Sequence, residues 1–457
     1  SPLALAVVGH ANTGKTSLIR TLLRHSHFGR VENAMGTTRH VEMASLLVEG
    51  QVVVRLFDTP GLEDSMALKA TLDSQPEMNN QARVSRAHAG RAKLVGFIEK
   101  VSQFPEFEQE IKVLKQALHS DVLLYVVDVR EPVLGKYRDE IAVLSMAGIP
   151  IIPVFNFIAI AKENLAYWQT AMAEFNLHAV VAFDTVAFDF EAEKRLYQKL
   201  QSVLEARYDF IQQLIDHRLN NWRDLQKAAA QIIAELVIDV ASLRMLQDGD
   251  DEPSHIQQGL IARVQQAEKN SVRQLLDLFE FSEAELEIRD LPIKNGEWHR
   301  DLLEPKALKA LGLSTSSAAA TGAVLGAGVD LALAGISLGV AAATGAALGA
   351  GLSTLKRFGK DMLAKVKGQH WLCVDDTTLT QMLLRQQALL SLLLSRGHAA
   401  QGRIQLAENL PQQLPKDWSR WLKTLRQHPE WSSLSHGDVN SREREAFVVE
   451  VGEGIGV

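Results

Sequence analysis

Residues 3–23, LALAVVGHANTGKTSLIRTLL, constrain the fold of this chain more than any other stretch. An unbroken apolar run comes first, then a loop from Gly9 to Gly14-Lys15-Thr16, then the amphipathic pattern of a helix. Glycines let such a loop curl so that its backbone N–H groups point inward, and the following helix adds its positive N-terminal end. The spacing is that of a P-loop, which predicts a buried strand, a phosphate-binding loop and a helix in succession.

The loop residues have candidate roles that follow from their chemistry. Lys15 supplies a positive charge to the outer phosphates and is a candidate catalytic residue, while the hydroxyl of Thr16 is a ligand for Mg²⁺. The candidate phosphate-binding residues of this loop are Gly9, Asn12, Thr13, Gly14, Lys15, Thr16 and Ser17.

Two later stretches complete a nucleotide site. Asp58 ends the strand-like run VVVRLF and is followed by Thr-Pro-Gly61, so its carboxylate can hold Mg²⁺ through water while the Gly61 N–H reaches a γ-phosphate. Between the loop and this run, MGTTRH contains Thr37 and Thr38; Thr38 is the better candidate to complete the metal shell and to assist catalysis. Ordinary turn chemistry is the alternative for the threonine pair. The candidate metal ligands are Thr16, Thr38 and Asp58.

The order GHANTGKTS, GTTRH and DTPG resembles the Era and TrmE branch of the translation-factor-type GTPases over residues 1–205. This resemblance implies GTP as the ligand, GTP hydrolysis as the reaction, and an α/β domain whose mostly parallel sheet is flanked by helices. The rest of the chain resembles a poorly characterised bacterial family in which such a head precedes a helical domain of unknown function.

The base-recognition motif departs from the family pattern. After a strand, the family has Asn-Lys-x-Asp, whose Asp pairs with guanine; here the register gives Asn156-Phe157-Ile158-Ala159. The Asn is kept, but the Lys and the Asp are absent, so the resemblance does not carry guanine specificity to this chain. Asp184, at the end of the next predicted strand, is the candidate replacement, and a turn-forming role is its alternative. The preference for GTP over ATP stays open.

The hydrolysis motif also departs from one branch of these enzymes. Ras-type enzymes orient the attacking water with a Gln after the glycine of D-x-x-G, where this chain has the apolar Leu62. We therefore expect slow hydrolysis. The resemblance to Era and TrmE implies a potassium ion held in part by Asn12, beside the alternative that the Asn12 side chain stabilises the loop by a hydrogen bond to its backbone.

The pattern changes along the chain and predicts the domain organisation. From about Glu191 onward, apolar residues recur at spacings of three and four, which is typical of helices. We expect a P-loop domain at 1–205 with a helical insertion at about 65–118, a helical domain at 206–305, a hairpin with basic flanks at 306–367, and a C-terminal helical region at 368–457 ending in a loose or edge segment. In the insertion, the basic residues Arg83, Arg86, Arg91 and Lys93 are expected on a solvated helix face.

An Ala/Gly-rich string occurs twice, as AAATGAVLGAG at 318–328 and as AAATGAALGAG at 341–351. Asp330 is the one ionisable residue within 311–355, and lysines and an arginine flank the segment. Its glycines recur four apart, a spacing that lets two helices approach closely. We expect an all-α C-terminal domain with an Ala/Gly-rich helical hairpin, either inserted in an anionic membrane, bound to a partner, or buried in the helical domain.

Composition limits the compartment and the partners. The single cysteine, Cys373, excludes an internal disulfide, and the sequence opens on a strand-like run rather than a signal peptide, so we expect a cytoplasmic protein. Peripheral association with the cytoplasmic membrane, or insertion in it, is the alternative. A net charge of −7 argues against nucleic acid as a partner, whereas a protein partner or a second copy of the chain stays open.

We predict a slowly hydrolysing GTP switch that controls the helical part. The alternatives are a soluble Era-type assembly factor acting on ribosome or RNA, and an NTPase with relaxed base specificity.

Overall fold

A computed structural model describes residues 1–24, 40–74, 86–247, 253–281, 293–294, 297–298, 370–396, 414–437, 439 and 441–455. Thr37, Thr38 and the whole predicted hairpin at 306–367 lie outside these residues. The chain forms two compact units: one contains Ser1–Asn221 with residues 395–396, and the other contains the remaining described residues from Trp222 onward.

The first unit is built on a six-stranded sheet with the order β2-β3-β1-β4-β5-β6. Its strands are β1 (Leu3–Val8), β2 (Glu42–Val48), β3 (Gln51–Asp58), β4 (Val122–Asp128), β5 (Ile151–Asn156) and β6 (Val181–Ala182). Only β2 runs antiparallel to its neighbour. Strands β4 and β5 are buried along their whole length, as their continuous apolar sequences predict for the centre of a parallel sheet. The predicted α/β architecture is confirmed.

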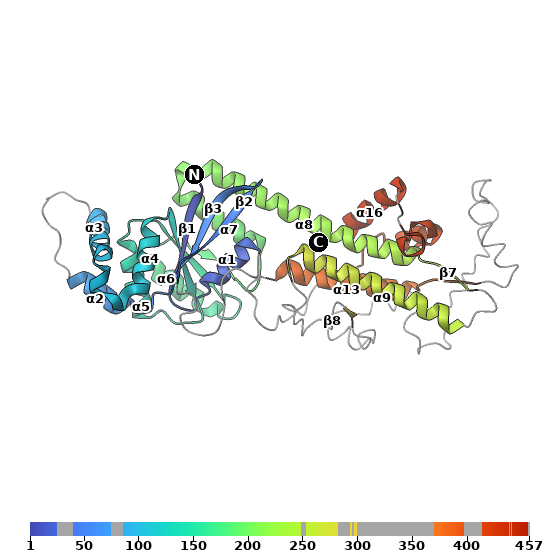
Figure 1. The fold of residues 1–457 in the computed structure, drawn as a ribbon, viewed down its shortest axis with the longest axis horizontal. Coiled ribbons are helices and arrows are strands. Elements are labelled where there is room, and N and C mark those ends of the chain that lie inside the picture. Colours follow the sequence, from blue (N-terminus) through green and yellow to red (C-terminus); the bar gives the residue numbers. More distant parts are fainter. Residues whose placement is uncertain are drawn as a thin grey trace. The chain divides into compact units, whose positions relative to one another are not determined.

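Helices cover both faces of this sheet (Figure 1). On one face, α1 (Lys15–Leu23), α7 (Phe190–Val203) and the first turns of α8 (Tyr208–Ser242) share a core with the sheet. On the other, α4 (Glu108–Leu118), α5 (Gly135–Ser145) and α6 (Leu165–Glu174) do so, joined by α2 (Ser65–Ser74) and α3 (Arg86–Glu99). The P-loop, between β1 and α1, therefore lies at the carboxyl edge of a rigid two-faced sheet.

Arg91 is exposed, as expected for the solvated face of the 65–118 region, and it also contacts two helix ends. Its guanidinium donates from Nη1 to the carbonyl of Ala147 at 2.9 Å and from Nη2 to the carbonyl of Leu118 at 3.2 Å. These carbonyls follow α5 and end α4, so Arg91 caps two helix ends rather than facing water alone. The sequence does not indicate this role, because both acceptors are distant along the chain.

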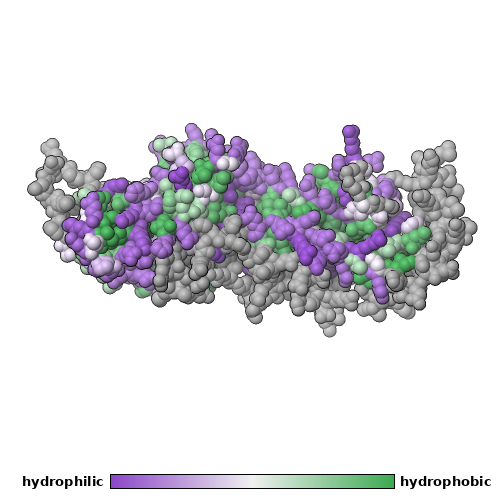
Figure 2. All heavy atoms as spheres, viewed as in Figure 1, coloured by the Kyte–Doolittle hydropathy of each residue, from purple (hydrophilic) through white to green (hydrophobic). Residues whose placement is uncertain are grey.

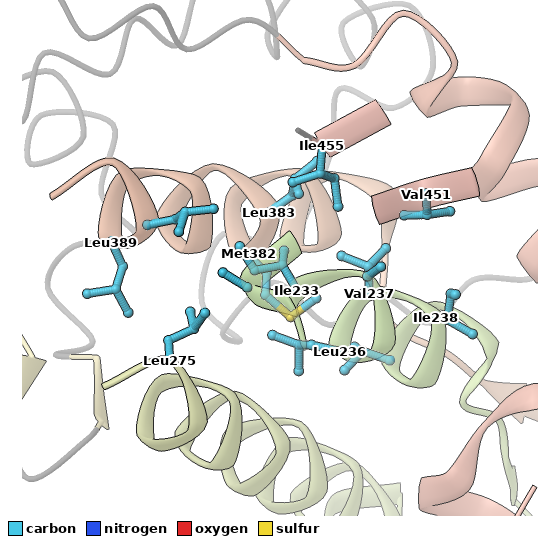
Figure 3. Close-up of a cluster of buried hydrophobic side chains, with 14 of the residues drawn as sticks. Ile233, Leu236, Val237, Ile238, Leu275, Met382, Leu383, Leu389, Val451 and Ile455 are labelled. Carbon is cyan, nitrogen blue, oxygen red and sulfur yellow. The ribbon is translucent and has the colours of Figure 1, made fainter. Parts of the chain in front are cut away.

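The second unit packs helices around one apolar core. It contains the rest of α8, then α9 (Pro253–Leu278), α13 (Asp376–Ser395), α14 (Trp418–Gln427), α15 (Ser433–His436) and α16 (Arg442–Ile455). Figure 3 shows side chains from α8, α9, α13 and α16, among them Val237, Leu275, Leu383 and Val451, gathered in this core. Three tryptophans of the C-terminal region are buried in this core too: Trp418, Trp421 and Trp431.

Two expectations for this unit are wrong. Helical periodicity was expected to continue from about Glu191, but Met245–Gln247 forms strand β7, which pairs antiparallel with β10 (His370–Leu372); β8 (Ile293–Lys294) and β9 (Glu297–Trp298) form a second short pair. The C-terminal segment, expected to be loose or an edge, is helix α16, because Phe447, Val451 and Ile455 fall at helical spacing and are buried.

Within the parts of the chain that the structure describes, no helix is long and apolar enough to cross a membrane. The Ala/Gly-rich segment 311–355 lies outside these parts. On the face displayed in Figure 2, hydrophobic residues of the described parts form small groups between hydrophilic ones.

Candidate nucleotide-binding site

The loop after β1 has a backbone that requires its glycines. Gly9 has φ 142° and Gly14 has φ 94°, both in the region that favours glycine. A Cβ at Gly9 would lie 2.6 Å from the carbonyl oxygen of Val126, and one at Gly14 would lie 2.3 Å from Nδ2 of Asn156. The loop is thus pressed against β4 and against the end of β5, in a curl that no larger residue permits at either position.

Lys15 lies inside this loop, and no carboxylate of the described residues is within hydrogen-bonding distance of its amine. Its Nζ donates to the carbonyl oxygens of Gly9 at 3.2 Å and of His10 at 2.6 Å. Burial lowers the pKa of Lys15 from 10.5 to about 8, because the charged amine loses its hydration. A buried amine held only by neutral carbonyls is suited to an anionic ligand such as a phosphate.

Asp58 and Thr16 meet at the end of β3 and the start of α1. The Thr16 hydroxyl donates to Oδ2 of Asp58 at 2.5 Å. The other carboxylate oxygen, Oδ1, is buried and has no hydrogen-bond partner among the described residues. Burial raises the pKa of Asp58 to about 6. A hydroxyl beside an orphaned carboxylate oxygen is the ligand set of a hard divalent cation, so these residues fit Mg²⁺.

The residues after Asp58 are docked on the P-loop. The Leu62 N–H donates to the Gly9 carbonyl at 3.2 Å, and a Cβ at Gly61 would lie 2.7 Å from the backbone of Ala11. Leu62 is fully buried, so its side chain neither reaches solvent nor offers a polar atom to a water molecule. The D-x-x-G segment and the P-loop therefore adjoin, as their motifs predict for a shared phosphate site.

Asn12 lies exposed at the tip of the loop with φ 61°, a left-handed conformation that Asn tolerates better than most residues. Its side chain makes no hydrogen bond with a described residue, so the expected alternative, a side-chain hydrogen bond that stabilises the loop, is not observed there. The amide is left accessible at the mouth of the site.

Asn156, at the end of β5, joins three segments. Its Nδ2 donates to the Thr13 carbonyl at 3.0 Å, and its Oδ1 accepts from the N–H of Phe157 at 2.9 Å and from both the N–H and the hydroxyl of Thr185 at 3.0 Å. The retained Asn thus ties the P-loop to the loops that follow β5 and β6.

Asp184, the candidate replacement for the missing base-reading Asp, is engaged with backbone. One carboxylate oxygen accepts from the Ala159 N–H at 3.2 Å and the other from the Val186 N–H at 3.0 Å. Asp184 therefore bridges the loops after β5 and β6, beside Ala159, whose side chain has no polar atom.

The sequence analysis missed a polar network behind the P-loop. Nδ1 of His10 lies 2.7 Å from Oε1 of the buried Glu140, whose Oε2 accepts from the Tyr125 hydroxyl at 2.7 Å, and Lys136 Nζ lies 3.1 Å from Nε2 of His10. This network fixes the loop to β4 and α5. No local signal reveals it, because its members come from three separate elements.

The structure brings most of the predicted site together. The P-loop residues, Asp58, Gly61 and Asn156 surround one position at the carboxyl edge of the sheet, and Asp184 lies at its β6 side. Thr38, the predicted third metal ligand, lies outside the described residues.

Two family models match the chain. Residues 4–157 match a family described as 50S ribosome-binding GTPase, and residues 169–453 match one described as a domain of unknown function (DUF3482).

Individual relatives share the N-terminal part. The GTPase Der of Chlorobium chlorochromatii is 27% identical over 171 residues, which are 35% of this chain and 36% of that protein, so the chain spans about a third of its length. Among solved structures, Aquifex aeolicus Era bound to GDP and AlF4⁻ is 16% identical, with 61% of this chain and 89% of that one covered at a TM-score of 0.29. Era in complex with MgGDPNP and nucleotides 1506–1542 of 16S ribosomal RNA is 14% identical over the same shares, again at 0.29.

Proposed function

Because the chain belongs to the family described as a domain of unknown function (DUF3482) and carries a P-loop GTPase domain before it, we propose that it is a molecular switch in which nucleotide state controls the helical part. The observation that carries the proposal is that, at one loop, the buried Lys15 amine is held by backbone carbonyls while a buried Asp58 oxygen has no hydrogen-bond partner among the described residues. A phosphate would supply an anionic partner for the Lys15 amine, and a cation would supply a partner for the Asp58 carboxylate.

Each residue has a role in this switch. The backbone of Gly9, Thr13 and Gly14, with Lys15 and Ser17, would hold the phosphates, and the N–H of Gly61 would sense the outermost one. Thr16 and Asp58, joined by Thr38, would hold Mg²⁺, which supplies charge neutralisation at the phosphates. Asn156 and Asp184 border the base. Lys15, Thr38 and Asn12 are the residues that we propose to assist hydrolysis, Asn12 by helping to hold a potassium ion.

Hydrolysis by this site is proposed to be slow. Leu62 occupies the position after the D-x-x-G glycine, and its buried, apolar side chain cannot orient water. Slow hydrolysis suits a switch, because the triphosphate state then lasts long enough to act on a partner.

The helical part is proposed to be the effector. The proposed domains of the chain are 1–205, 206–305, 306–367 and 368–457. The hairpin at 306–367 is the element that would act on the target. The proposed target is an anionic membrane surface at the cytoplasmic side, because the segment 311–355, with Asp330 as its one ionisable residue, has basic flanks. Binding to a protein partner or to a second copy is the alternative use of the hairpin.

The test is Mg²⁺-dependent GTP binding by the full chain and by Lys15→Ala. We expect Lys15→Ala to lose detectable binding, because a buried cation facing the phosphates is removed, while circular dichroism shows an unchanged fold. Lys69→Ala is the matched control, because Lys69 is a partly exposed lysine paired with Asp73 on α2. Equal GTP affinity in Lys15→Ala and in the unaltered chain would refute the proposal.

A second candidate function is binding to ribosome or RNA, favoured by the description of the family that matches residues 4–157. Retention on ribosomal RNA, compared with flotation on anionic liposomes in the same buffer, separates the two functions. Nucleotide-dependent retention on RNA without flotation would favour this second candidate.

A further inference from the structure

The order of the strands decides where the base of a bound nucleotide lies. Asp58 ends β3, on one side of the P-loop strand β1, and Thr16 reaches it there. The cation and the outer phosphates therefore belong on the β3 side. The rest of the nucleotide leaves on the opposite side, over the carboxyl ends of β4, β5 and β6, because ligands of such sheets lie at that edge.

An aromatic ring and a guanidinium stand at that place. Phe157 follows β5 directly, and its Cζ would lie 3.6 Å from a Cβ at Gly14, so the ring borders the P-loop. The Arg130 guanidinium, two residues after β4, lies 3.8 Å from the centroid of this ring. Phe157 has φ 61°, a conformation uncommon for a large residue, and such outliers persist where the surroundings enforce them.

Arg130 is held in position by a carboxylate. Its Nε and Nη2 donate to both oxygens of Asp128, at distances from 2.7 to 3.2 Å. The fixed guanidinium lies over one face of the half-buried ring, and we call this stacked pair the Phe157–Arg130 platform. Flat aromatic and guanidinium surfaces bind nucleobases by stacking, which tolerates different bases because every base has a π-face.

Among the described residues, three carboxylates act on Arg130: Asp128 and Asp184, which have other partners, and Glu131, which is exposed. Asp128 binds Arg130, and each oxygen of Asp184 accepts a backbone N–H. A base edge is discriminated strongly when a buried polar group would otherwise stay unpaired, and none of the three carboxylates is in that position.

We infer that the nucleotide base stacks on the Phe157–Arg130 platform and that this site accepts purine nucleoside triphosphates with little discrimination between guanine and adenine. The inference rests on the proposed function, because it requires the phosphates to lie in the P-loop. It goes further in naming the substrate class and the residues that hold the base.

The experiment measures binding of GMPPNP, AMPPNP and inorganic tripolyphosphate to the full chain with Mg²⁺ by isothermal titration calorimetry. The two nucleotides should bind with dissociation constants within about tenfold of each other. Phe157→Leu and Arg130→Gln should weaken both nucleotides by a similar factor of about tenfold, the size of a lost stacking contact, and should leave tripolyphosphate binding unchanged.

Two variants control for folding and for charge. Phe157→Tyr keeps a flat ring and should bind as the unaltered chain does. Arg138→Gln removes a matched guanidinium, which pairs with Glu174 and lies 5.9 Å from the Phe175 ring rather than the Phe157 ring, and it should change no affinity.

Three results would overturn the inference. The first is a preference for GMPPNP beyond about tenfold that Asp184→Asn abolishes, since that carboxylate would then read the base. The second is any other preference of that size: either for AMPPNP, or for GMPPNP in a form that Asp184→Asn does not abolish. The third is unchanged affinity of Phe157→Leu for both nucleotides. If the unaltered chain binds neither the nucleotides nor tripolyphosphate, the proposed function itself fails. Binding of tripolyphosphate therefore distinguishes a failure of this inference alone from a failure of the proposed function.

Discussion

Two buried ionisable groups, Lys15 and Asp58, carry the chemistry of the candidate site at the scale of single residues. Burial lowers the pKa of Lys15 to about 8 and raises that of Asp58 to about 6, so both charges are costly in the chain without ligand. Their cost falls when phosphate and cation bind. The free chain is therefore expected to gain stability on binding Mg²⁺ and nucleotide.

Without nucleotide or Mg²⁺, the stability of the chain should depend on pH through Asp58. Its pKa in the folded chain, about 6, exceeds its ordinary value of 3.8, so folding favours the protonated form. The resulting stability is fully present below the ordinary pKa and is lost as pH rises through about 6, to a total of about 3 kcal/mol. Asp58→Asn cannot ionise and should escape this loss, which makes it more stable than the unaltered chain at about pH 8.

Urea unfolding in EDTA at about pH 5 and about pH 8 measures this difference. Asp128→Asn is the control, since Asp128 also ends a strand of the sheet, β4, but pairs with Arg130, and its loss should leave stability unchanged or lower. An Asp58→Asn variant that is no more stable than the unaltered chain at the higher pH would contradict the argument.

Asn12 should make hydrolysis sensitive to the monovalent cation. We expect GTP hydrolysis to be several-fold faster in potassium than in sodium chloride, because the accessible amide helps to hold a potassium ion at the phosphates. Asn12→Gly removes the amide yet keeps the φ of 61° unstrained, whereas Asn12→Ala adds backbone strain. Both variants should lose the difference between the salts. Equal rates for the unaltered chain in the two salts would leave Asn12 with a backbone role only.

At the scale of elements, a buried ionic cluster joins α1, α7 and α8. Glu193 on α7 is fully buried and accepts from Arg218 Nε on α8 at 2.6 Å and from the Tyr197 hydroxyl at 3.2 Å. Arg218 also donates to the carbonyl of Leu22 in the last turn of α1 at 2.9 Å. The helix that follows the P-loop is thus tied to α8, the 35-residue helix that continues into the second unit.

Glu193→Gln should destabilise the chain by about 3–5 kcal/mol, because it leaves the buried Arg218 charge without its carboxylate. Urea unfolding measures the change. The matched control is Glu191→Gln on the same helix, where the carboxylate is 60% exposed and 3.7 Å from Lys194, and it should cost no more than about 0.5 kcal/mol. Equal costs for the two variants would show that the cluster contributes nothing beyond a surface pair.

At the scale of the whole molecule, the proposed switch needs an output that the described residues do not contain. Deleting 311–355 tests the hairpin as that output. Full-length protein should float with anionic liposomes, because each Lys or Arg near such a surface contributes about 1 kcal/mol. The deletion variant should stay folded, keep its nucleotide affinity and stay at the bottom of the gradient.

Nucleotide affinity serves as the control for folding of the deletion variant. If the full chain does not float in any nucleotide state and the deletion aggregates, the Ala/Gly-rich repeat packs inside the protein. The membrane hypothesis is then wrong.

Local sequence patterns were enough to predict the elements whose conformation depends on neighbouring residues. Residues 3–23 predicted strand, loop and helix in register, since the glycine conformations and the helix start are local properties, and continuous apolar runs predicted the buried strands β4 and β5. Apolar spacing likewise predicted the long helices of the second unit.

Only the tertiary structure decided which distant groups meet. The β7–β10 pair, Arg91 at two helix ends, Glu140 behind His10 and Arg130 over Phe157 all join elements that are far apart in the chain. A carboxylate at a strand end, such as Asp184, has the same local sequence whether it binds backbone or a base. Its partners follow from the packing of β5 beside β6, and no periodicity encodes that packing.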